Sequence, residues 1–275
     1  MMDSLSVFMP TKDNHDTFFL SLLSAIQKVE PDSIHILDSG DKPVCSSPLF
    51  SHCIGIAEDN GIEVFYTYNR ISLSLAREEV ISCKGDLILQ LDSDIVIQDF
   101  PSRDTIESAF LKYGVFLAPF VVSPVNLEGY EDYDTRKYFF PSIEFEAKFK
   151  STAIWYRQFI NAHTNFSNNL KYSSVPFSGT FGLLARKVDL AELYTTLEIQ
   201  DINVKAILPR EDMLITRGLC ILRGKYGVLS PQYRVYHLGS SRSLWNRMTD
   251  EVIQENFIAC SNWEELKLLA HHLEG

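Results

Sequence analysis

The stretch KGDLILQLDSD, residues 84–94, decides the predicted fold. Its centre, residues 86–91, is a nearly continuous apolar run, which is typical of a strand buried on both faces of a parallel sheet. Asp92 and Asp94 follow at once, and side chains at positions i and i+2 of an extended segment point to the same side. Ligands bind at the carboxyl ends of the strands in such sheets. The stretch therefore predicts two carboxylates that face a ligand site.

Strand and helix patterns alternate on both sides of this stretch over the first 125 residues. The expected strands span residues 5–9, 33–37, 62–68, 86–91 and 115–122, and the expected helices span residues 18–29, 48–60, 72–83 and 102–113. Such alternation indicates βαβ units. We therefore expect an α/β fold in which helices cover both faces of a mostly parallel central sheet, as three layers.

The pattern changes after Pro124, where residues 126–142 are polar and aromatic without a clear period. The elements expected beyond them are a helix at 144–162, strands at 177–185 and 228–237, a loop and helix at 209–218, and a C-terminal helix opened by a capping box at 261–264. No internal repeat or low-complexity linker occurs. We therefore expect one compact domain with two halves, a donor-binding half at residues 1–125 and an acceptor-binding, catalytic half at residues 126–275.

Composition excludes several classes of protein. The formal net charge is −11, which argues against a nucleic-acid partner because that binding needs a basic surface. No stretch approaches the ~20 apolar residues of a membrane span, and residues 1–4 are not the start of a secretory signal. The five cysteines are odd in number and widely spread, which indicates reduced, mostly buried thiols in a cytoplasmic protein.

The spacing of Asp92 and Asp94 also predicts a site for a bound cation. Two carboxylates held close together repel each other unless a cation lies beside them. Hard divalent ions such as Mn²⁺ and Mg²⁺ take oxygen ligands and commonly bridge a carboxylate to a phosphate. The competing interpretation is a solvated turn, which the buried strand before Asp92 makes less favoured.

These residues resemble the core of GT-A fold glycosyltransferases, especially the family 2 type, in which a Gly-Asp pair, an apolar strand and a DxD motif follow one another. The resemblance covers residues 5–240 in the order of the family. The further matching segments are residues 6–11, which end a first strand in Pro10-Thr11; the acidic loop at residues 37–40; Leu75-Ala76-Arg77; the Glu-Asp pair in residues 210–213; and residues 236–239 around His237.

The resemblance implies transfer of a sugar from a nucleotide-diphosphate sugar to an acceptor hydroxyl of a glycan, a lipid or a small molecule. It implies a site for Mn²⁺ or Mg²⁺ formed by Asp92, Asp94 and His237. Asp212 would be the general base of an inverting displacement, with Glu211 supporting it. The implied donor-binding residues are Pro10, Thr11, Asp38, Arg77, Asp92, Ser93, Asp94, Ser178 and Gly179, the last two in the run of small residues 178–182.

Each assigned role has a structural alternative. Asp38 could cap a turn, Arg77 could form a surface ion pair, and His237 could be an ordinary half-buried histidine. Glu211 and Asp212 could be an acidic pair favoured by the start of a helix. The nucleobase stays open, because the second acidic position of the loop after the second strand is Ser39 here.

Other functions stay open as well. Asp92 and Asp94 fit the nucleophile motif of haloacid-dehalogenase-like phosphatases, although that motif normally opens its domain. A nucleotidyltransferase would need a Gly-rich basic loop after the first strand, which residues 10–14 lack. A non-catalytic nucleotide-sugar-binding protein, a retaining transferase and assembly into homo-oligomers are also open. No Gln-x-x-Arg-Trp motif occurs, so polymer synthesis through a membrane is not expected.

Overall fold

The computed structural model describes residues 3–71, 78–107, 114–122, 173–175, 180–204, 211–238, 256–257 and 259–273. In these residues one sheet contains the strands β1 (Leu5–Thr11), β2 (Ser33–Asp38), β3 (Glu63–Tyr68), β4 (Leu87–Gln90), β5 (Ile95–Asp99), β6 (Phe116–Val122), β7 (Ser173–Val175), β8 (Leu183–Arg186) and β9 (Gly227–His237). The strand order is β3-β2-β1-β4-β8-β6-β9-β5, with β7 beside β9.

The sheet is mostly parallel, as predicted. Strands β3, β2, β1 and β4 are parallel to one another, and β6 is parallel to β9. Strand β8 is antiparallel to both β4 and β6, while β5 and β7 are antiparallel to β9. Strand β6, which ends before residue 125, pairs with β8 and β9, so the sheet takes strands from both expected halves of the chain.

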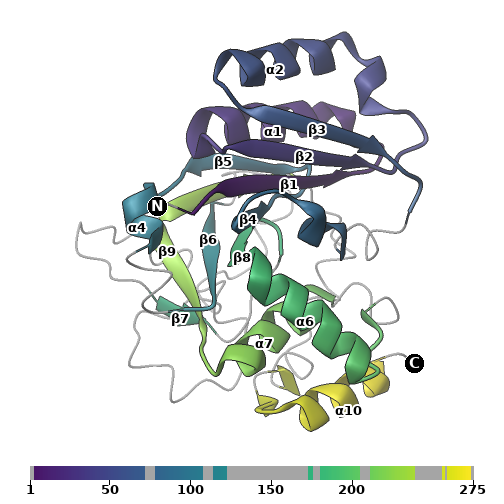
Figure 1. The fold of residues 1–275 in the computed structure, drawn as a ribbon, viewed down its shortest axis with the longest axis vertical. Helices are drawn as coiled ribbons and strands as arrows, with labels where there is room; N and C mark the ends of the chain where they lie inside the picture. Colours follow the sequence, from purple (N-terminus) through teal and green to yellow (C-terminus); the bar gives the residue numbers. More distant parts are fainter. Residues whose placement is uncertain are drawn as a thin grey trace, which may run out of the picture.

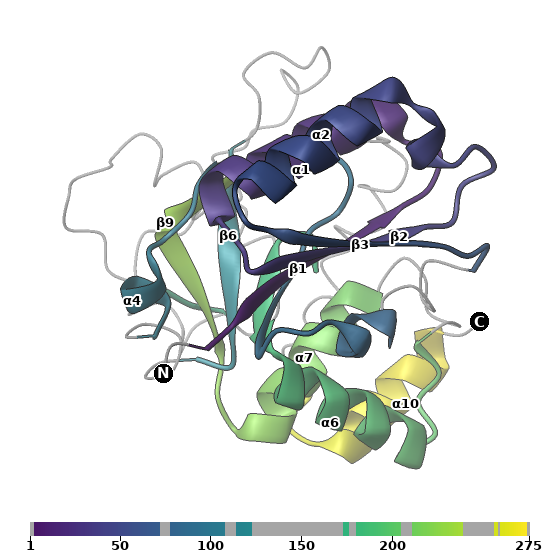
Figure 2. The same ribbon diagram turned by 45° about the horizontal axis from the view of Figure 1, so that its top comes forward.

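Helices cover both faces of the sheet, which confirms the predicted three layers (Figure 1). Helices α1 (His15–Val29) and α2 (Pro48–Asp59) lie on one face, and α6 (Lys187–Ile199) and α7 (Glu211–Arg223) lie on the other (Figure 2). Helix α10 (Trp263–Leu273) lies against α7. The short elements are η1 (Val44–Ser46), η2 (Glu79–Ser82) and α4 (Arg103–Ile106).

Local sequence signals explain where the helices begin and end. Helix α2 begins after Ser47, whose hydroxyl accepts a hydrogen bond from Leu49 N at 3.3 Å, with Pro48 at the first helical position. Gly61 follows it with φ +74°, a left-handed conformation that favours glycine after a helix. The capping box of α10 starts one residue later than predicted, because Asn262 Oδ1 accepts from Glu265 N at 3.0 Å.

The sequence patterns missed the strands β5 and β7 and the helices η1 and α6. Strand β5 follows the Asp92-Ser93-Asp94 turn at once and pairs with β9, although no strand was predicted there. Helix α6 buries Leu190, Leu193 and Leu197 at helical spacing in a segment left unassigned. The predicted strand at 177–185 is also corrected, because residues 180–182 form a turn before β8.

Several predictions fall partly or wholly outside the described residues. These are the helix at 144–162, most of the helix at 72–83, of which η2 is described, and the end of the helix at 102–113, of which α4 is described. In the part of the chain that the structure describes, no helix is long and apolar enough to cross a membrane. All five cysteines are free, and all but Cys45 are buried, as predicted.

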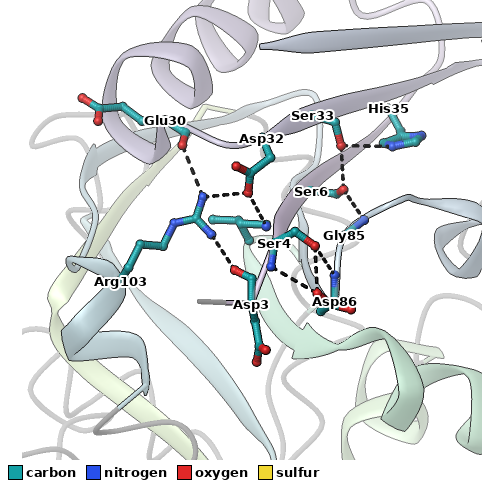
Figure 3. Close-up of polar contacts among 11 residues, drawn as sticks. Asp3, Ser4, Ser6, Glu30, Asp32, Ser33, His35, Gly85, Asp86 and Arg103 are labelled. Atoms are coloured by element: carbon teal, nitrogen blue, oxygen red, sulfur yellow. Dashed lines mark hydrogen bonds and ion pairs between the residues drawn. The ribbon is translucent and has the colours of Figure 1, made fainter. Parts of the chain in front are cut away.

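A polar network closes the amino ends of β1, β2 and β4 (Figure 3). The Arg103 guanidinium bonds Asp32 Oδ2 and the carbonyl of Asp3, at 3.1 and 3.2 Å. Asp32 Oδ2 also accepts from Leu5 N at 2.7 Å. These contacts fasten α4 to the first two strands, at the end opposite the predicted ligand site.

Candidate functional site

Asp38, the last residue of β2, lies at the predicted ligand end of the sheet and is 0% exposed. Its Oδ1 accepts a hydrogen bond from Gly40 N at 3.0 Å, and its Oδ2 accepts from Val44 N at 2.7 Å and from Tyr66 Oη at 2.9 Å. The carboxylate thus closes the loop at residues 39–44, which is the turn-capping alternative. A contact between Asp38 and a nucleotide remains a prediction.

Tyr66 supports this arrangement from β3. Burial raises the pKa of its hydroxyl above the ordinary value, and hydrogen bonds with Cys45 and Asp38 raise it further. The hydroxyl therefore stays protonated and donates to Asp38. The ring packs edge-on against Phe50 of α2, with centroids 5.1 Å apart.

Pro10 and Thr11, two predicted donor-site residues, end β1 and are buried. The carbonyl of Thr11 accepts from Ser39 N at 2.9 Å, so the loops after β1 and β2 are joined. Asp13, which no pattern singled out, strengthens this junction because its Oδ1 accepts from Asp41 N at 2.7 Å. Asp13 has φ +53°, a conformation that aspartate adopts more readily than most residues.

Asp92, Ser93 and Asp94 form the turn between β4 and β5, and all three are half-buried. The Ser21 hydroxyl of α1 donates to the carbonyl of Asp92 at 3.1 Å. The Asn14 amide, which precedes α1, donates to Ser93 Oγ at 3.3 Å. Helix α1 thus fixes the path of this turn at the carboxyl end of β4.

The end of β9 lies beside Asp94. Leu238 N donates to the carbonyl of Asp94 at 2.8 Å, and His237 pairs with Ile95 in the antiparallel register. Asp94 and His237, two predicted metal ligands, are far apart in the sequence. Their main chains nevertheless lie side by side in the fold. The side chain of His237 lies outside the described residues.

The donor set at this turn fits a hard divalent cation. Asp92 and Asp94 supply carboxylate oxygens, which Mn²⁺ and Mg²⁺ accept as ligands, and imidazole at His237 would suit Mn²⁺. Among the described residues, no group of three potential ligand side chains comes together. That finding does not include the imidazole of His237, so the predicted three-residue metal site remains a prediction.

Glu211 and Asp212 are the first residues of α7 and are 4% and 6% exposed. The start of a helix stabilises negative charge, so the alternative of an acidic helix-opening pair is compatible with their position. Asp212 has a more specific contact, because Thr180 Oγ1 donates to its Oδ1 at 2.5 Å. A surface acidic pair would lack such a buried donor.

Gln90 is a buried polar residue that the sequence interpretation treated only as part of an apolar strand. It ends β4, two residues before Asp92, and is 1% exposed. Neither polar atom of its side chain has a hydrogen-bond partner among the described residues. A glutamine in the apolar run LILQL is the sequence signal that could have identified it.

Arg77, Ser178 and Gly179 lie outside the described residues, so nothing tests their predicted roles. The described part brings the other predicted residues to three places. Pro10, Thr11 and Asp38 lie in the joined loops after β1 and β2, and residues 92–94 lie in the turn after β4. Glu211 and Asp212 open α7 on the face opposite α1.

No protein-family model matches the chain, and no curated protein matches it in sequence. Solved structures do match. GalNAc-T7 with UDP, GalNAc and Mn²⁺ aligns over 88% of this chain and 45% of its own, with TM-score 0.58 and 12% identity. The mannosyltransferase PcManGT of Pyrobaculum calidifontis with GDP-Man and Mn²⁺ aligns over 98% and 69%, with TM-score 0.54 and 12% identity.

S. aureus TarS aligns over 88% of this chain and 38% of its own, with TM-score 0.51 and 15% identity. The chain has the GT-A fold. It spans less than half the length of GalNAc-T7 and of TarS. At 12–15% identity these likenesses establish the GT-A fold alone, and they confirm the fold class predicted from sequence.

Proposed function

We propose that the chain is a glycosyltransferase that moves a sugar from a nucleotide-diphosphate sugar to an acceptor hydroxyl. The observation that carries the proposal is the backbone junction at the end of β4, where Leu238 N bonds the carbonyl of Asp94 at 2.8 Å in a GT-A fold. This junction joins the half-buried turn of Asp92 and Asp94 to the strand that ends in His237. Two structural neighbours contain a nucleotide or nucleotide sugar together with Mn²⁺.

In this proposal Asp92, Asp94 and His237 hold Mn²⁺ or Mg²⁺. When bound there, the cation would supply Lewis-acid stabilisation of the charge that develops on the diphosphate leaving group. Asp38 and Asp13 hold the loops after β1 and β2 closed, so the main chain of residues 39–41 forms one wall of the nucleotide site. Pro10, Thr11, Arg77, Ser178 and Gly179 are the other proposed donor-binding residues.

Asp212 is the proposed general base. Its carboxylate takes the proton from the acceptor hydroxyl while the acceptor oxygen forms a bond to the anomeric carbon. The bond from that carbon to the diphosphate oxygen breaks, and its electron pair leaves with the nucleoside diphosphate. Glu211 supports the base at the start of α7. Attack from the face opposite the leaving group inverts the anomeric configuration.

The haloacid-dehalogenase-like phosphatase has no support among these structural neighbours, whose fold is GT-A. A non-catalytic nucleotide-sugar-binding protein shares every donor-site feature described above. The buried hydrogen bond from Thr180 to Asp212 favours the enzyme, because nucleotide binding at the end of β4 does not require an oriented carboxylate at the start of α7.

The test begins with thermal unfolding in a panel of nucleoside diphosphates and nucleotide sugars, each with Mn²⁺ or with a chelator. A ligand at ~100 times its Kd stabilises by about 2.7 kcal/mol, a shift of a few degrees. We expect a metal-dependent shift for one nucleotide. The matching sugar donor is then incubated with glycan, lipid and small-molecule acceptors, and NMR of the product gives the anomeric configuration.

The variant Asp212→Asn separates enzyme from binding protein. We expect it to keep the metal-dependent thermal shift and to lose transfer. A bound donor that wild-type protein never transfers would overturn the transferase in favour of the binding protein. A retained configuration would overturn the role of Asp212 as base while leaving the transferase intact.

A further inference from the structure

A buried threonine, Thr180, contacts the carboxylate of Asp212. The Thr180 hydroxyl donates to Asp212 Oδ1 at 2.5 Å, and the two residues are 0% and 6% exposed. Hydrogen bonds to an ionised carboxylate are shorter and roughly twice as strong as those between neutral groups. The contact therefore restricts the orientation of the Asp212 side chain as well as stabilising it.

The turn that carries Thr180 is fastened to the strand that leads to Asp92. Gly182 N donates to the carbonyl of Gln90 at 2.7 Å, at the end of β4. Gly182 has φ +87°, and a Cβ there would lie 2.9 Å from Tyr233 Oη. Both facts explain why glycine occupies this position, and the hydrogen bond to Gln90 holds the turn against the end of β4.

These contacts form a continuous connection between the two acidic sites. It runs from the strand before Asp92, through the main chain of Gly182, to the hydroxyl of Thr180 and the carboxylate of Asp212. Helix α7 lies in a different layer from β4, and this connection links the carboxylate of Asp212 to the strand before Asp92. A misplacement of about 1 Å between reacting groups can cost 10²-fold in rate.

We propose that Thr180 is a positioning residue, whose hydroxyl holds the carboxylate of Asp212 in the orientation that receives the acceptor proton. The proposal rests on the proposed function, because it requires Asp212 to act as base. Residues 178–182 were singled out in the sequence only for their small side chains, and the proposal adds a specific role for the hydroxyl of Thr180. Any residue with a hydroxyl donor at the same place could fill this role.

The test compares Thr180→Val, which has nearly the same shape but no donor, with Thr180→Ser, which keeps the donor. For Thr180→Val we expect kcat to fall by about 10- to 100-fold, since a hydrogen bond to a charged group is lost. The KM for the nucleotide sugar should stay within about twofold, because the donor site at the end of β4 is unchanged. Thr180→Ser should recover most of kcat.

Thr216→Val is the matched control. Thr216 is 0% exposed and lies on α7, the helix that begins with Glu211 and Asp212. Its hydroxyl donates to the main-chain carbonyl of Asp212 at 2.8 Å. This variant removes a buried threonine hydroxyl without touching the carboxylate, so kcat should stay within about threefold. Thermal unfolding of every variant verifies folding, and Thr180→Ala replaces Thr180→Val if the valine variant does not fold.

The outcomes separate the two proposals. If wild-type protein transfers no sugar to any acceptor, the proposed function fails and the role of Thr180 fails with it. If wild type is active and Asp212→Asn is inactive, wild-type kcat in Thr180→Val overturns the positioning role alone. Equal losses in Thr180→Val and Thr180→Ser, or an equal loss in Thr216→Val, also overturn it. A loss of kcat in Thr180→Val that serine restores supports it.

Discussion

Two acidic loops at the same edge of the sheet differ in what their carboxylates do. Strands β2 and β4 both lie beside β1, and each is followed by an acidic loop. Asp38 after β2 is 0% exposed, and three internal donors bond its carboxylate. Asp92 and Asp94 after β4 are half-buried, and their main-chain carbonyls accept the hydrogen bonds from Ser21 and Leu238.

The difference shows that the position of an acid at the end of a strand does not by itself assign its role. A carboxylate that bonds several buried donors is a structural anchor, because removing it leaves those donors unsatisfied. In the turn of Asp92 and Asp94, the hydrogen bonds from Ser21 and Leu238 go to main-chain carbonyls and do not use the carboxylates. In the proposed site, Asp38 would therefore support the loop after β2, and Asp92 and Asp94 would bind the cation.

The largest expected effect belongs to the turn after β4. Asp94→Ala should lower the rate of metal-dependent transfer by about 10³-fold, since the proposed cation, which would stabilise the leaving group, loses a ligand. The metal-dependent thermal shift with the nucleotide should vanish, and the melting transition without ligand verifies that the variant is folded.

The control for this variant is Asp104→Ala. Asp104 is exposed on α4, which lies near the amino end of β1. The control removes the same charge far from the turn. An equal loss of activity in both variants would show a general charge effect and contradict the metal site. An unchanged thermal shift in Asp94→Ala would contradict it as well.

The second effect concerns stability. Asp38→Ala should lower the free energy of unfolding by about 2–4 kcal/mol, because Gly40 N, Val44 N and the Tyr66 hydroxyl lose their acceptor. Urea unfolding measures this change. Asp41→Ala, at a side chain 83% exposed, should change stability by no more than about 0.5 kcal/mol. An Asp38→Ala protein with full stability and weaker nucleotide binding would make Asp38 a ligand instead of an anchor.

A smaller loss of stability is expected when one hydrogen-bond donor to Asp38 is removed. Tyr66→Phe removes one of the three donors to Asp38 and should cost about 1.5 kcal/mol, the value for a hydrogen bond to a charged group. Tyr68→Phe is the matched control on the same strand, because Tyr68 is 42% exposed and donates to the neutral carbonyl of Gly40. Urea unfolding should rank Tyr66→Phe as the more damaging change.

The smallest expected effect is a change of stability with pH that arises from His35 and not from the acidic loops. Burial, with help from Lys84 and Lys187, lowers the pKa of His35 on β2 from 6.5 to about 4, while Glu63 acts in the opposite direction. Between these values the unfolded chain binds a proton that the folded protein does not. This contribution therefore leaves stability intact above pH 6.5 and lowers it as the pH falls toward 4.

Urea unfolding at pH ~7 and pH ~5 tests this expectation. Wild type should lose about 1 kcal/mol through His35, a reduced value because the side chain is only half-buried. His35→Gln should lack this part of the pH dependence. If the variant loses as much stability as wild type between the two pH values, the acid sensitivity arises elsewhere and His35 does not contribute.

Much of the fold could be predicted from the sequence because its signals are local. The apolar run before Asp92 identified a central strand, and the alternation around it identified a mostly parallel sheet. The helix predicted at 48–60 matches α2 to within one residue at its end. Strand β5 was not predicted because it follows a tight turn with no separating loop. The turn at residues 180–182 was not predicted because it is short.

The candidate site was predictable only as a set of residue types at the ends of strands. The sequence by itself determined the acidic pair at the end of β4, the acid at the end of β2 and the acidic start of α7. Only the tertiary structure decided that Asp38 is an anchor, that the end of β9 lies beside Asp94, and that Thr180 bonds Asp212. Periodicity reports which face of its own element a residue occupies. Contacts between distant segments depend on how the sheet and helices pack, and that packing decides which polar groups are satisfied and which remain for a ligand.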